Sequence, residues 1–309
     1  MRHGSPKARD HHYLIMGPWN HAGTRTPSKE FDGLKLGDAA VVDLNKVHKE
    51  WYDWTLKNRK KPSFLKKKLA YYVTGAETWK YNDNLVSISP TRWKLYLDSN
   101  NGQANEVFHS GTLSESKPGK SAPDRYTYDP LDLRAADMEG EELKEGITDQ
   151  RYALNLLGSG LVYHTEPFPE PKELVGCAKL TAWLSMDVPD TDFLVSLWEI
   201  KSNGAGILLT NDGMRARYRE SFKHEKLVKR GEVNRYEFDK FLFFGRQIGR
   251  RSRLRLLVQT PNSIYWEKNY NTGGAVAEES KKDARTAHIT LHHDSRYASV
   301  LELPVAKAG

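Results

Sequence analysis

His21 is the residue whose surroundings most strongly suggest chemistry. It lies in the stretch 17–23, GPWNHAG, shortly after the apolar run Leu14-Ile15-Met16. An apolar run that stops at Gly-Pro predicts a short buried strand followed by a turn. Histidine exchanges a proton near neutral pH and binds metals, and a turn at the end of a strand both fixes and exposes its side chain. The competing interpretation is a histidine that merely caps the turn.

The other histidines give little support to a metal site. His11-His12 and His292-His293 are adjacent pairs, and neighbours on a strand point to opposite faces. The run 98–102, DSNNG, follows a predicted strand and is at best a weak calcium candidate. The sequence therefore predicts neither a bound metal nor a cofactor.

The segment around His21 contains one further element. Residues 24–38 are polar and predict a loop, and Asn58 to Pro62 predict the end of a helix. Apolar residues recur between these two segments at three- and four-residue spacing, namely Ala40, Val41, Leu44, Val47, Trp51 and Trp54. This spacing predicts an amphipathic helix of about four turns with Asp38 as its N-cap. One strand and one helix cannot bury their own apolar faces, so this segment either packs on the rest of the chain or ends a larger α/β domain.

The residue pattern of the sequence changes after Pro62. Short aromatic and β-branched runs, separated by turn residues, occur at 69–73, 93–97, 125–128, 161–165, 179–186, 193–200, 235–238, 254–259, 286–291 and 299–303. Many short strands of this kind predict a mainly β fold, a sandwich or jelly roll. The polar stretch 110–150 predicts a long surface excursion. We therefore divide the chain into residues 1–62 and 63–309.

Composition limits the partners of this 309-residue chain. Its formal net charge is +7, but basic and acidic residues are mixed along most of the sequence, which is typical of a soluble protein. The densest basic run, 57–68, carries no nucleic-acid-binding motif and is interpreted as a solvated linker. A single cysteine excludes an internal disulfide. No apolar run reaches membrane-spanning length and no leader is recognisable, so we expect no membrane partner. The missing binding motif makes nucleic acid an unexpected partner as well. The localisation stays open.

The motifs resemble one family over the whole chain. GPW-x-H after an apolar strand resembles the histidine segment of the X-Pro dipeptidyl-peptidase and cocaine-esterase-like (CocE/NonD) serine hydrolases, which include α-amino-acid ester hydrolases and cephalosporin acylases. Residues 51–57, WYDWTLK, resemble the last helix of that family's hydrolase domain, and 72–79, YVTGAETW, the start of its C-terminal jelly roll. Further resembling segments are YDP (128–130), YHTEP (163–167), PDTDF (189–193), DGMRARYR (212–219) and NYNTGG (269–274).

The resemblance implies both a fold and a chemistry. The fold is an α/β-hydrolase domain with a helical cap, followed by a galactose-binding-like jelly roll. Residues 1–62 then correspond to the last strand and helix of the hydrolase domain, and 63–309 to the jelly roll. The chemistry is acyl transfer to water by a Ser-Asp-His triad, in which His21 matches the general base.

The sequence departs from the family pattern in the other two triad members. They precede the histidine in the family, and only twenty residues do so here. Ser5 lies in HGSP, which is no nucleophile elbow, and Asp10 is too close to the strand at Leu14 for the crossover between parallel strands. We therefore expect the C-terminal portion of a serine hydrolase that acts on an amide or ester, that is inactive alone, and that self-associates through its exposed apolar remnant.

The charged residues of the β region invite a second interpretation. Asp190 and Asp192 precede three arginines, Arg215, Arg217 and Arg219. Acid–arginine pairs in sandwich loops are usually structural, so we predict at least one ion pair here and no catalytic role. The alternative function is a stand-alone carbohydrate- or protein-binding β-sandwich, which exposed aromatics on one face would favour. Several tryptophans are instead expected in the core, among Trp79, Trp93, Trp183, Trp198 and Trp266.

Overall fold

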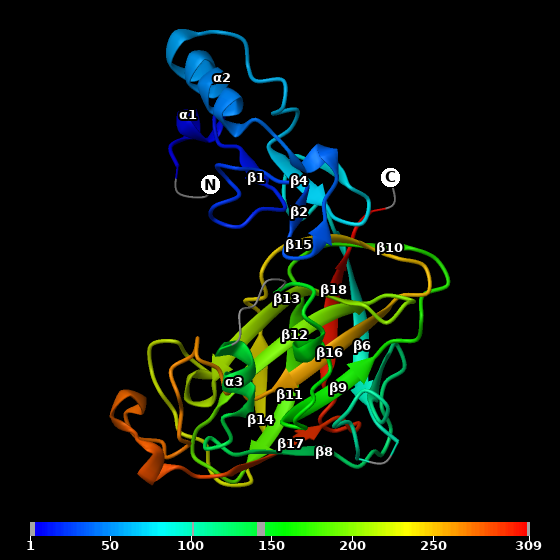
Figure 1. Cartoon of the computed structure of the whole chain (residues 1–309), viewed down its shortest axis with the longest axis vertical. Helices are drawn as coiled ribbons and strands as arrows, with labels where there is room; N and C mark the ends of the chain where they lie inside the picture. Colours follow the sequence, from blue (N-terminus) through cyan, green and yellow to red (C-terminus); the bar gives the residue numbers. More distant parts are fainter. Residues whose placement is uncertain (1–3, 101, 141–145, 308–309) are drawn as a thin grey trace.

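The computed structural model describes residues 4–100, 102–140 and 146–307 and is mainly β, as predicted (Figure 1). The helices are α1 (Pro6–Arg9), α2 (Leu44–Lys57), α3 (Arg134–Gly140) and α4 (Gln150–Ala153). The strands are β1 (Leu14–Met16), β2 (Glu30–Phe31), β3 (Leu34–Lys35), β4 (Leu69–Val73), β5 (Thr78–Asn82), β6 (Thr91–Asp98), β7 (Gly111–Ser114), β8 (Asp124–Tyr128), β9 (Gly160–His164), β10 (Lys172–Gly176), β11 (Lys179–Met186), β12 (Asp192–Ile200), β13 (Gly206–Arg215), β14 (Asn234–Phe238), β15 (Phe244–Ile248), β16 (Arg253–Gln259), β17 (Ala287–His292) and β18 (Val300–Val305).

Thirteen of the described strands form one connected sheet, which wraps around a single core as a sandwich. Its main path runs β13-β12-β16-β9-β7-β6-β18-β11-β17-β8. Leu97 of β6, Leu184 of β11, Val195 of β12 and Leu256 of β16 are all fully buried in the same apolar cluster. Side chains alternate across a strand, so strands far apart on the path contribute one face each to this core.

The strand predicted before His21 is present, but it is not buried as predicted, because it lies at the edge of a small three-stranded sheet, where Leu14 is exposed and Ile15 and Met16 are half-buried. β1 pairs in parallel with β4, with Leu14 opposite Leu69 and Met16 opposite Tyr71. β4 also pairs with β5 in antiparallel orientation, and all five residues of β4 are buried. The sheet therefore joins elements from both sides of residue 62. The division of the chain at that residue stays a prediction.

The predicted helix is present, but its first residue and its N-cap differ from the prediction. α2 begins at Leu44, and Asp43, not Asp38, caps it by accepting the Lys46 amide at 2.9 Å. Asp38 lies in a preceding 3-10 turn, which keeps it outside the helix. Asn58 ends α2 in the left-handed conformation. Two acids in short succession can each cap a helix, and the sequence alone could not choose between them.

The N-terminal elements meet the sandwich along β15. The Thr74 amide donates to the Gly245 carbonyl at 3.0 Å, and the Gln247 amide donates to the Thr74 carbonyl at 2.8 Å. In Figure 1, α1, β1 and α2 lie at one end of the molecule, and β10 and β15 mark the junction with the sandwich. Trp54 of α2 packs on His11 and Tyr13 near the N-terminus, with ring centroids 5.1 and 5.9 Å apart.

Two expectations need correction. Of the five tryptophans considered for the core, only Trp198 is buried. The indole N–H groups of Trp79 and Trp93 reach outward to Ala39 O and Glu115, which holds the rings at the edge of the core. The stretch 110–150 is also less irregular than expected, because β7 lies within it and pairs with β6 and β9.

Candidate functional site

The turn after β1 holds its backbone firmly and leaves His21 exposed. Trp19 Nε1 donates to the Ala40 carbonyl at 3.0 Å, which ties the start of the turn to the segment before α2. Asn20 Oδ1 accepts the Gly23 amide, and Thr24 Oγ1 donates to the His21 carbonyl, each at 2.8 Å. The imidazole is thus presented on a braced turn at the C-terminal end of a strand, as the sequence predicts.

The other residues considered for a triad do not meet His21. Ser5 Oγ accepts the Ala8 amide at 3.3 Å and so caps α1. The Asp10 carbonyl accepts Lys68 Nζ at 2.5 Å. Within the part of the chain that the structure describes, no side chain forms a hydrogen bond with the His21 imidazole. The described residues therefore contain a candidate base without a hydrogen-bonded nucleophile or acid.

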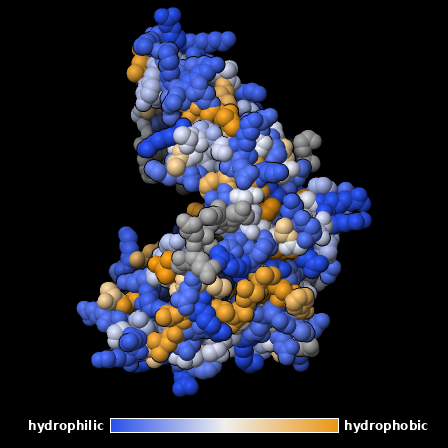
Figure 2. All heavy atoms as spheres, in the orientation of Figure 1, coloured by the Kyte–Doolittle hydropathy of each residue, from blue (hydrophilic) through white to orange (hydrophobic). Residues whose placement is uncertain are grey.

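A cavity of about 950 Å³ lies beside this turn, between the N-terminal elements and the sandwich. Trp19, Asn20 and Thr24 of the turn line it. The walls are largely apolar, with Leu36 and Tyr72 on one side and Leu208, Phe243 and Phe244 on the other. Figure 2 shows the molecule hollowed between these two parts. Sequence reasoning missed the cavity, because its walls come from segments as far apart in the chain as Ile15 and Arg246.

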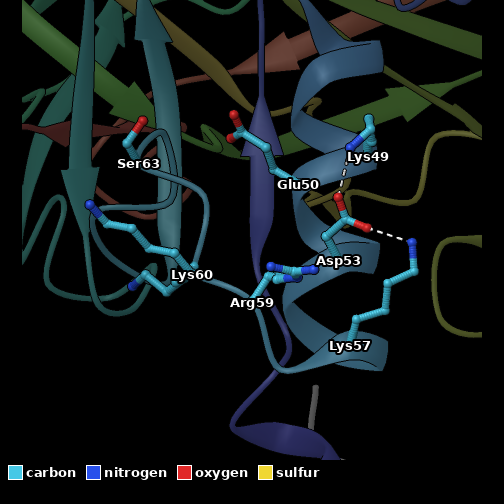
Figure 3. A pocket seen from close by; sticks show the side chains of 8 residues that line it. Lys49, Glu50, Asp53, Lys57, Arg59, Lys60 and Ser63 are labelled. Atoms are coloured by element: carbon cyan, nitrogen blue, oxygen red, sulfur yellow. Dashed lines mark hydrogen bonds and ion pairs between the residues drawn. The ribbon is translucent and has the colours of Figure 1, made fainter.

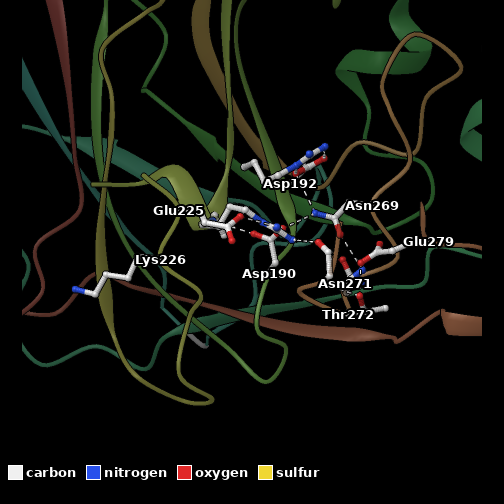
Figure 4. A network of polar contacts seen from close by, with 12 residues as sticks. Asp190, Asp192, Glu225, Lys226, Asn269, Asn271, Thr272 and Glu279 are labelled. Carbon is white, nitrogen blue, oxygen red and sulfur yellow. Dashed lines mark hydrogen bonds and ion pairs between the residues drawn. The ribbon is translucent and has the colours of Figure 1, made fainter. Parts of the chain in front are cut away.

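The predicted ion pair between the 189–193 segment and the arginines is confirmed (Figure 4). Arg217 Nε donates to Asp190 Oδ2 and Arg215 Nε to Asp192 Oδ1, both at 2.8 Å. Asn269 Nδ2 donates to both carboxylates, at 3.0 and 3.2 Å. Burial raises the pKa of Asp190, although Arg217 and Asn269 act in the opposite direction.

Most polar groups of this network are satisfied within it, and among the described residues only Asn271 Oδ1 and the neighbouring Thr191 Oγ1 are buried there without a partner. Arg217 fills its donors with Asp190, Glu225 and the Gly274 carbonyl. Asn271 and Gly273 adopt left-handed backbone angles, with φ of 68° and 82°, as the turn prediction requires. The cluster links three loops, and its chemistry is structural.

A second hollow, of about 840 Å³, lies beside α2 and is strongly cationic (Figure 3). Its lining residues are Lys49, Glu50, Asp53, Lys57, Arg59, Lys60, Lys61 and Ser63. Asp53 accepts Lys49 at 2.7 Å and Lys57 at 2.8 Å, and these bonds lower its pKa to about 2. Among the described residues no histidine lines this hollow, so it is a weaker active-site candidate than the His21 turn.

Two histidines to which the sequence analysis gave no catalytic role are buried in polar clusters. His164 accepts Arg255 Nε at its Nε2 (2.7 Å) and lies 2.7 Å from Ser110 Oγ at its Nδ1, and burial lowers its pKa to about 3. His293 lies 2.9 Å from Asp124 Oδ2, which also accepts the Tyr163 hydroxyl at 2.7 Å. His164 is 7% and His293 is 1% exposed, so neither imidazole is presented to solvent as that of His21 is.

The weak calcium candidate gains no support from its surroundings. Asp98 Oδ1 accepts the Ser99 amide at 2.8 Å, and residue 101 lies outside the described residues. The described parts of the chain contain no group of three or more His, Cys, Asp or Glu side chains that could hold a metal. Among the same residues, no helix is both long and apolar enough to cross a membrane.

The sequence of the chain is similar to a known protein family and to a curated protein. Residues 64–302 match the family model of the X-Pro dipeptidyl-peptidase C-terminal non-catalytic domain. The chain is 27% identical over 301 residues to cocaine esterase of Rhodococcus sp. (strain MB1 Bresler), covering 95% of this chain and 51% of that protein. It thus spans about half the length of the curated relative that it matches.

Two solved structures share the fold. One is an aminopeptidase from a marine sediment Thaumarchaeota archaeon, with a TM-score of 0.81, 22% identity, and coverage of 98% of this chain and 51% of that one. The other is an α-amino acid ester hydrolase, with a TM-score of 0.82, 20% identity, and coverage of 97% and 51%. At this level of identity the likeness establishes the fold alone.

Proposed function

The chain belongs to the family of X-Pro dipeptidyl-peptidase C-terminal non-catalytic domains, and from that premise we propose that it is the C-terminal portion of a serine hydrolase that acts on an amide or ester bond. The observation that carries the proposal is His21 itself. It is exposed on a braced turn at the C-terminal end of a strand, and its neighbours Asn20 and Thr24, though not His21 itself, line a large and largely apolar cavity. The name of the relative cocaine esterase supports an ester as the bond that is cleaved.

In this proposal His21 is the general base and then the general acid. It takes the proton of a serine hydroxyl as the serine attacks the acyl carbon, and it returns that proton to the leaving alcohol or amine. A carboxylate that accepts the other ring N–H would hold the imidazole in the required tautomer. We propose that both partners come from residues beyond this chain, and that the chain alone is inactive.

The free side of β1 is consistent with this arrangement. Among the described strands β1 pairs only with β4, so one edge of β1 is unpaired. Leu14 is 37% exposed, and Tyr52 and Leu56 of α2 are 53% and 74% exposed. An unpaired edge beside exposed apolar side chains favours pairing and burial against another unit. In its absence we propose that the chain self-associates through this surface.

Hydrolysis of a small activated ester, such as 4-nitrophenyl butyrate, tests the proposal. The measurement compares the 309-residue chain, a longer form with any residues encoded upstream of Met1, and His21→Ala in both. We expect turnover in the longer form alone, with a loss of at least about 10³-fold in His21→Ala. Turnover by the short chain that His21→Ala abolishes would instead require a nucleophile within these residues.

A second candidate function is a carbohydrate- or protein-binding module. It is favoured by Tyr265 and Trp266, which are 72% and 39% exposed on one loop of the sandwich. Aromatic rings of this kind offer a flat apolar face to a sugar ring or an apolar side chain. Binding to a panel of oligosaccharides that Tyr265→Ala abolishes, together with an inactive longer form, would favour this function over the hydrolase.

A further inference from the structure

Arg246 is a buried cation whose outer end has no partner in the described structure. It lies in β15, is 6% exposed, and lines the cavity beside the His21 turn. Its Nε donates to Glu199 Oε2 at 2.7 Å. Among the described residues, no acceptor forms a hydrogen bond with either of its terminal nitrogens. These two nitrogens are not among the fully buried side-chain atoms that lack a partner, so they keep some exposure, and an acceptor that enters the cavity can reach them.

The other two buried arginines form hydrogen bonds with more of their guanidinium nitrogens than Arg246 does. Arg217 uses Nε and both terminal nitrogens, on Asp190, Glu225 and the Gly274 carbonyl. Arg255 uses Nε on His164 and one terminal nitrogen on the Ala153 carbonyl. Arg246 alone of these three keeps both terminal nitrogens free, and it alone lines the cavity.

The surroundings hold Arg246 in place. Glu199, 1% exposed, is fixed in turn by the Gly249 amide, which donates to its Oε1 at 2.9 Å. Gly75 has a φ of 82°, and a Cβ at this glycine would lie 3.3 Å from the guanidinium carbon of Arg246. The same Cβ would lie 2.5 Å from the Gln247 carbonyl oxygen, so the close approach of this backbone requires glycine first, and the guanidinium packs beside it. Such preorganisation is what a recognition site needs.

We propose that the cavity binds an apolar molecule with a terminal carboxylate, and that the terminal nitrogens of Arg246 hold that carboxylate. The planar guanidinium edge matches a carboxylate in a two-point contact. Glu199 already balances the charge of Arg246, so one further negative charge suits the site better than the two of a phosphate monoester. Leu208, Phe243 and Phe244 provide apolar surface for the rest of the molecule.

That this ligand is a substrate rests on the proposed hydrolase function, whereas its binding to the cavity does not. The substrate would then carry a carboxylate at the end distant from the bond that is cleaved. The binding step can be measured without turnover, so its failure and the failure of the hydrolase proposal are distinguishable. His21→Ala should abolish turnover in the longer form and leave binding in the cavity unchanged.

Calorimetric titration of the 309-residue chain tests the site with four probes. Decanoate has the apolar part and the carboxylate, decanol and decylammonium lack the carboxylate, and acetate lacks the apolar part. We expect decanoate to bind about 10- to 100-fold more tightly than decanol, the range of a charge-assisted hydrogen bond. Decylammonium and acetate should bind no better than decanol. Equal affinity for decanoate and decanol would overturn the proposal without any variant.

Variants then assign the contact to Arg246. Arg246→Gln should reduce the affinity for decanoate to that for decanol, and Arg246→Gln with Glu199→Gln should do the same without leaving a buried charge unpaired. Arg250→Gln is the matched control, because Arg250 is exposed in the same region and lies outside the cavity. Unchanged decanoate binding in a folded Arg246→Gln protein would contradict the proposal. If both Arg246 variants fail to fold, the comparison of probes on the unmodified chain decides.

Discussion

Arg217 donates from its Nε to Asp190 Oδ2 at 2.8 Å, and neither side chain is more than 6% exposed. The Arg217 amide also donates to Asp190 Oδ1 at 2.9 Å, so one carboxylate fixes both the backbone and the side chain of this arginine. The pair joins the loop before β12 to the 3-10 turn after β13. This one contact therefore links the segments PDTDF (189–193) and DGMRARYR (212–219).

Replacing Arg217 by Met should destabilise the sandwich strongly. The change leaves the Asp190 carboxylate buried without its cation, and breaking a buried pair in this way costs about 3–5 kcal/mol in the free energy of unfolding. Urea unfolding followed by circular dichroism measures the loss. Arg230→Met, at an exposed loop residue, is the control and should change the free energy by less than about 0.5 kcal/mol. Similar values for both variants would show that the pair is not a stabilising contact.

Gly111→Ala should destabilise the junction between β6, β7 and β9. A Cβ at this position would lie 2.3 Å from the Tyr163 ring and 2.7 Å from the Asp98 carbonyl. Tyr163 is fully buried and its hydroxyl is held by Asp124, so the ring cannot move aside without cost. Overpacking of this kind costs about 1–3 kcal/mol, measurable by urea unfolding.

Gly119→Ala is the matched control for that substitution. No heavy atom lies within 4 Å of a Cβ at Gly119, and its φ is outside the left-handed region. We expect its free energy of unfolding to stay within about 0.5 kcal/mol of that of the unmodified chain. A Gly111→Ala protein as stable as the Gly119→Ala protein would mean that the sheet adjusts freely around Tyr163.

The strands that the sequence predicts best are those in which apolar residues dominate. β11 has the bounds that its sequence predicts, and β12 and β16 lie within one residue of theirs, because their side chains are almost all buried. Sequence patterns miss β13 and β15, because GILLTNDGMR and FGRQI contain glycine and polar residues that disfavour strands. Pairing with β12 and β10 overrides that preference.

The candidate site is predictable from sequence only in its local part. The strand and turn that carry His21 lie within the ten consecutive residues 14–23, so a local sequence pattern is enough to predict them. The cavity beside it depends on how Leu36 and Phe243 come together across the junction, which no local pattern encodes. Arg246 gives no signal of its own, because a buried arginine and an exposed one look the same in a short stretch of sequence.

Asp43→Ala should loosen α2, whereas Asp38→Ala should not. Asp43 accepts the Lys46 amide, and loss of an N-cap of this type costs about 0.5–2 kcal/mol. Within the described residues the Asp38 carboxylate forms an exposed ion pair with Lys29, and such a pair contributes little. Hydrogen exchange in residues 44–57 should accelerate about 2- to 30-fold in the Asp43 variant. The opposite ranking of the two variants would restore the cap that the sequence predicted.

His164 should make the chain less stable as the pH falls below neutrality. Burial lowers the pKa of its imidazole to about 3 in the folded chain, against an ordinary value of about 6.5 when unfolded. Between these values the unfolded chain takes up a proton that the folded chain refuses, so stability is full above about pH 6.5 and decreases as the pH falls towards 3. The Arg255 N–H that His164 accepts, and the nearby Ser110 hydroxyl, fit the neutral imidazole.

Urea unfolding at pH 7, 6, 5 and 4 isolates this contribution when the unmodified chain is compared with His164→Gln. Glutamine can also accept from Arg255 and donate to Ser110, but it does not titrate. Below pH 6 the unmodified chain should lose about 1.4 kcal/mol more per pH unit than the variant. Carboxyl groups that titrate in the same range affect both proteins equally, so they cancel in the difference. Parallel curves would show that His164 gains its proton in the folded chain, and therefore that its hydrogen bond with Arg255 does not persist in solution.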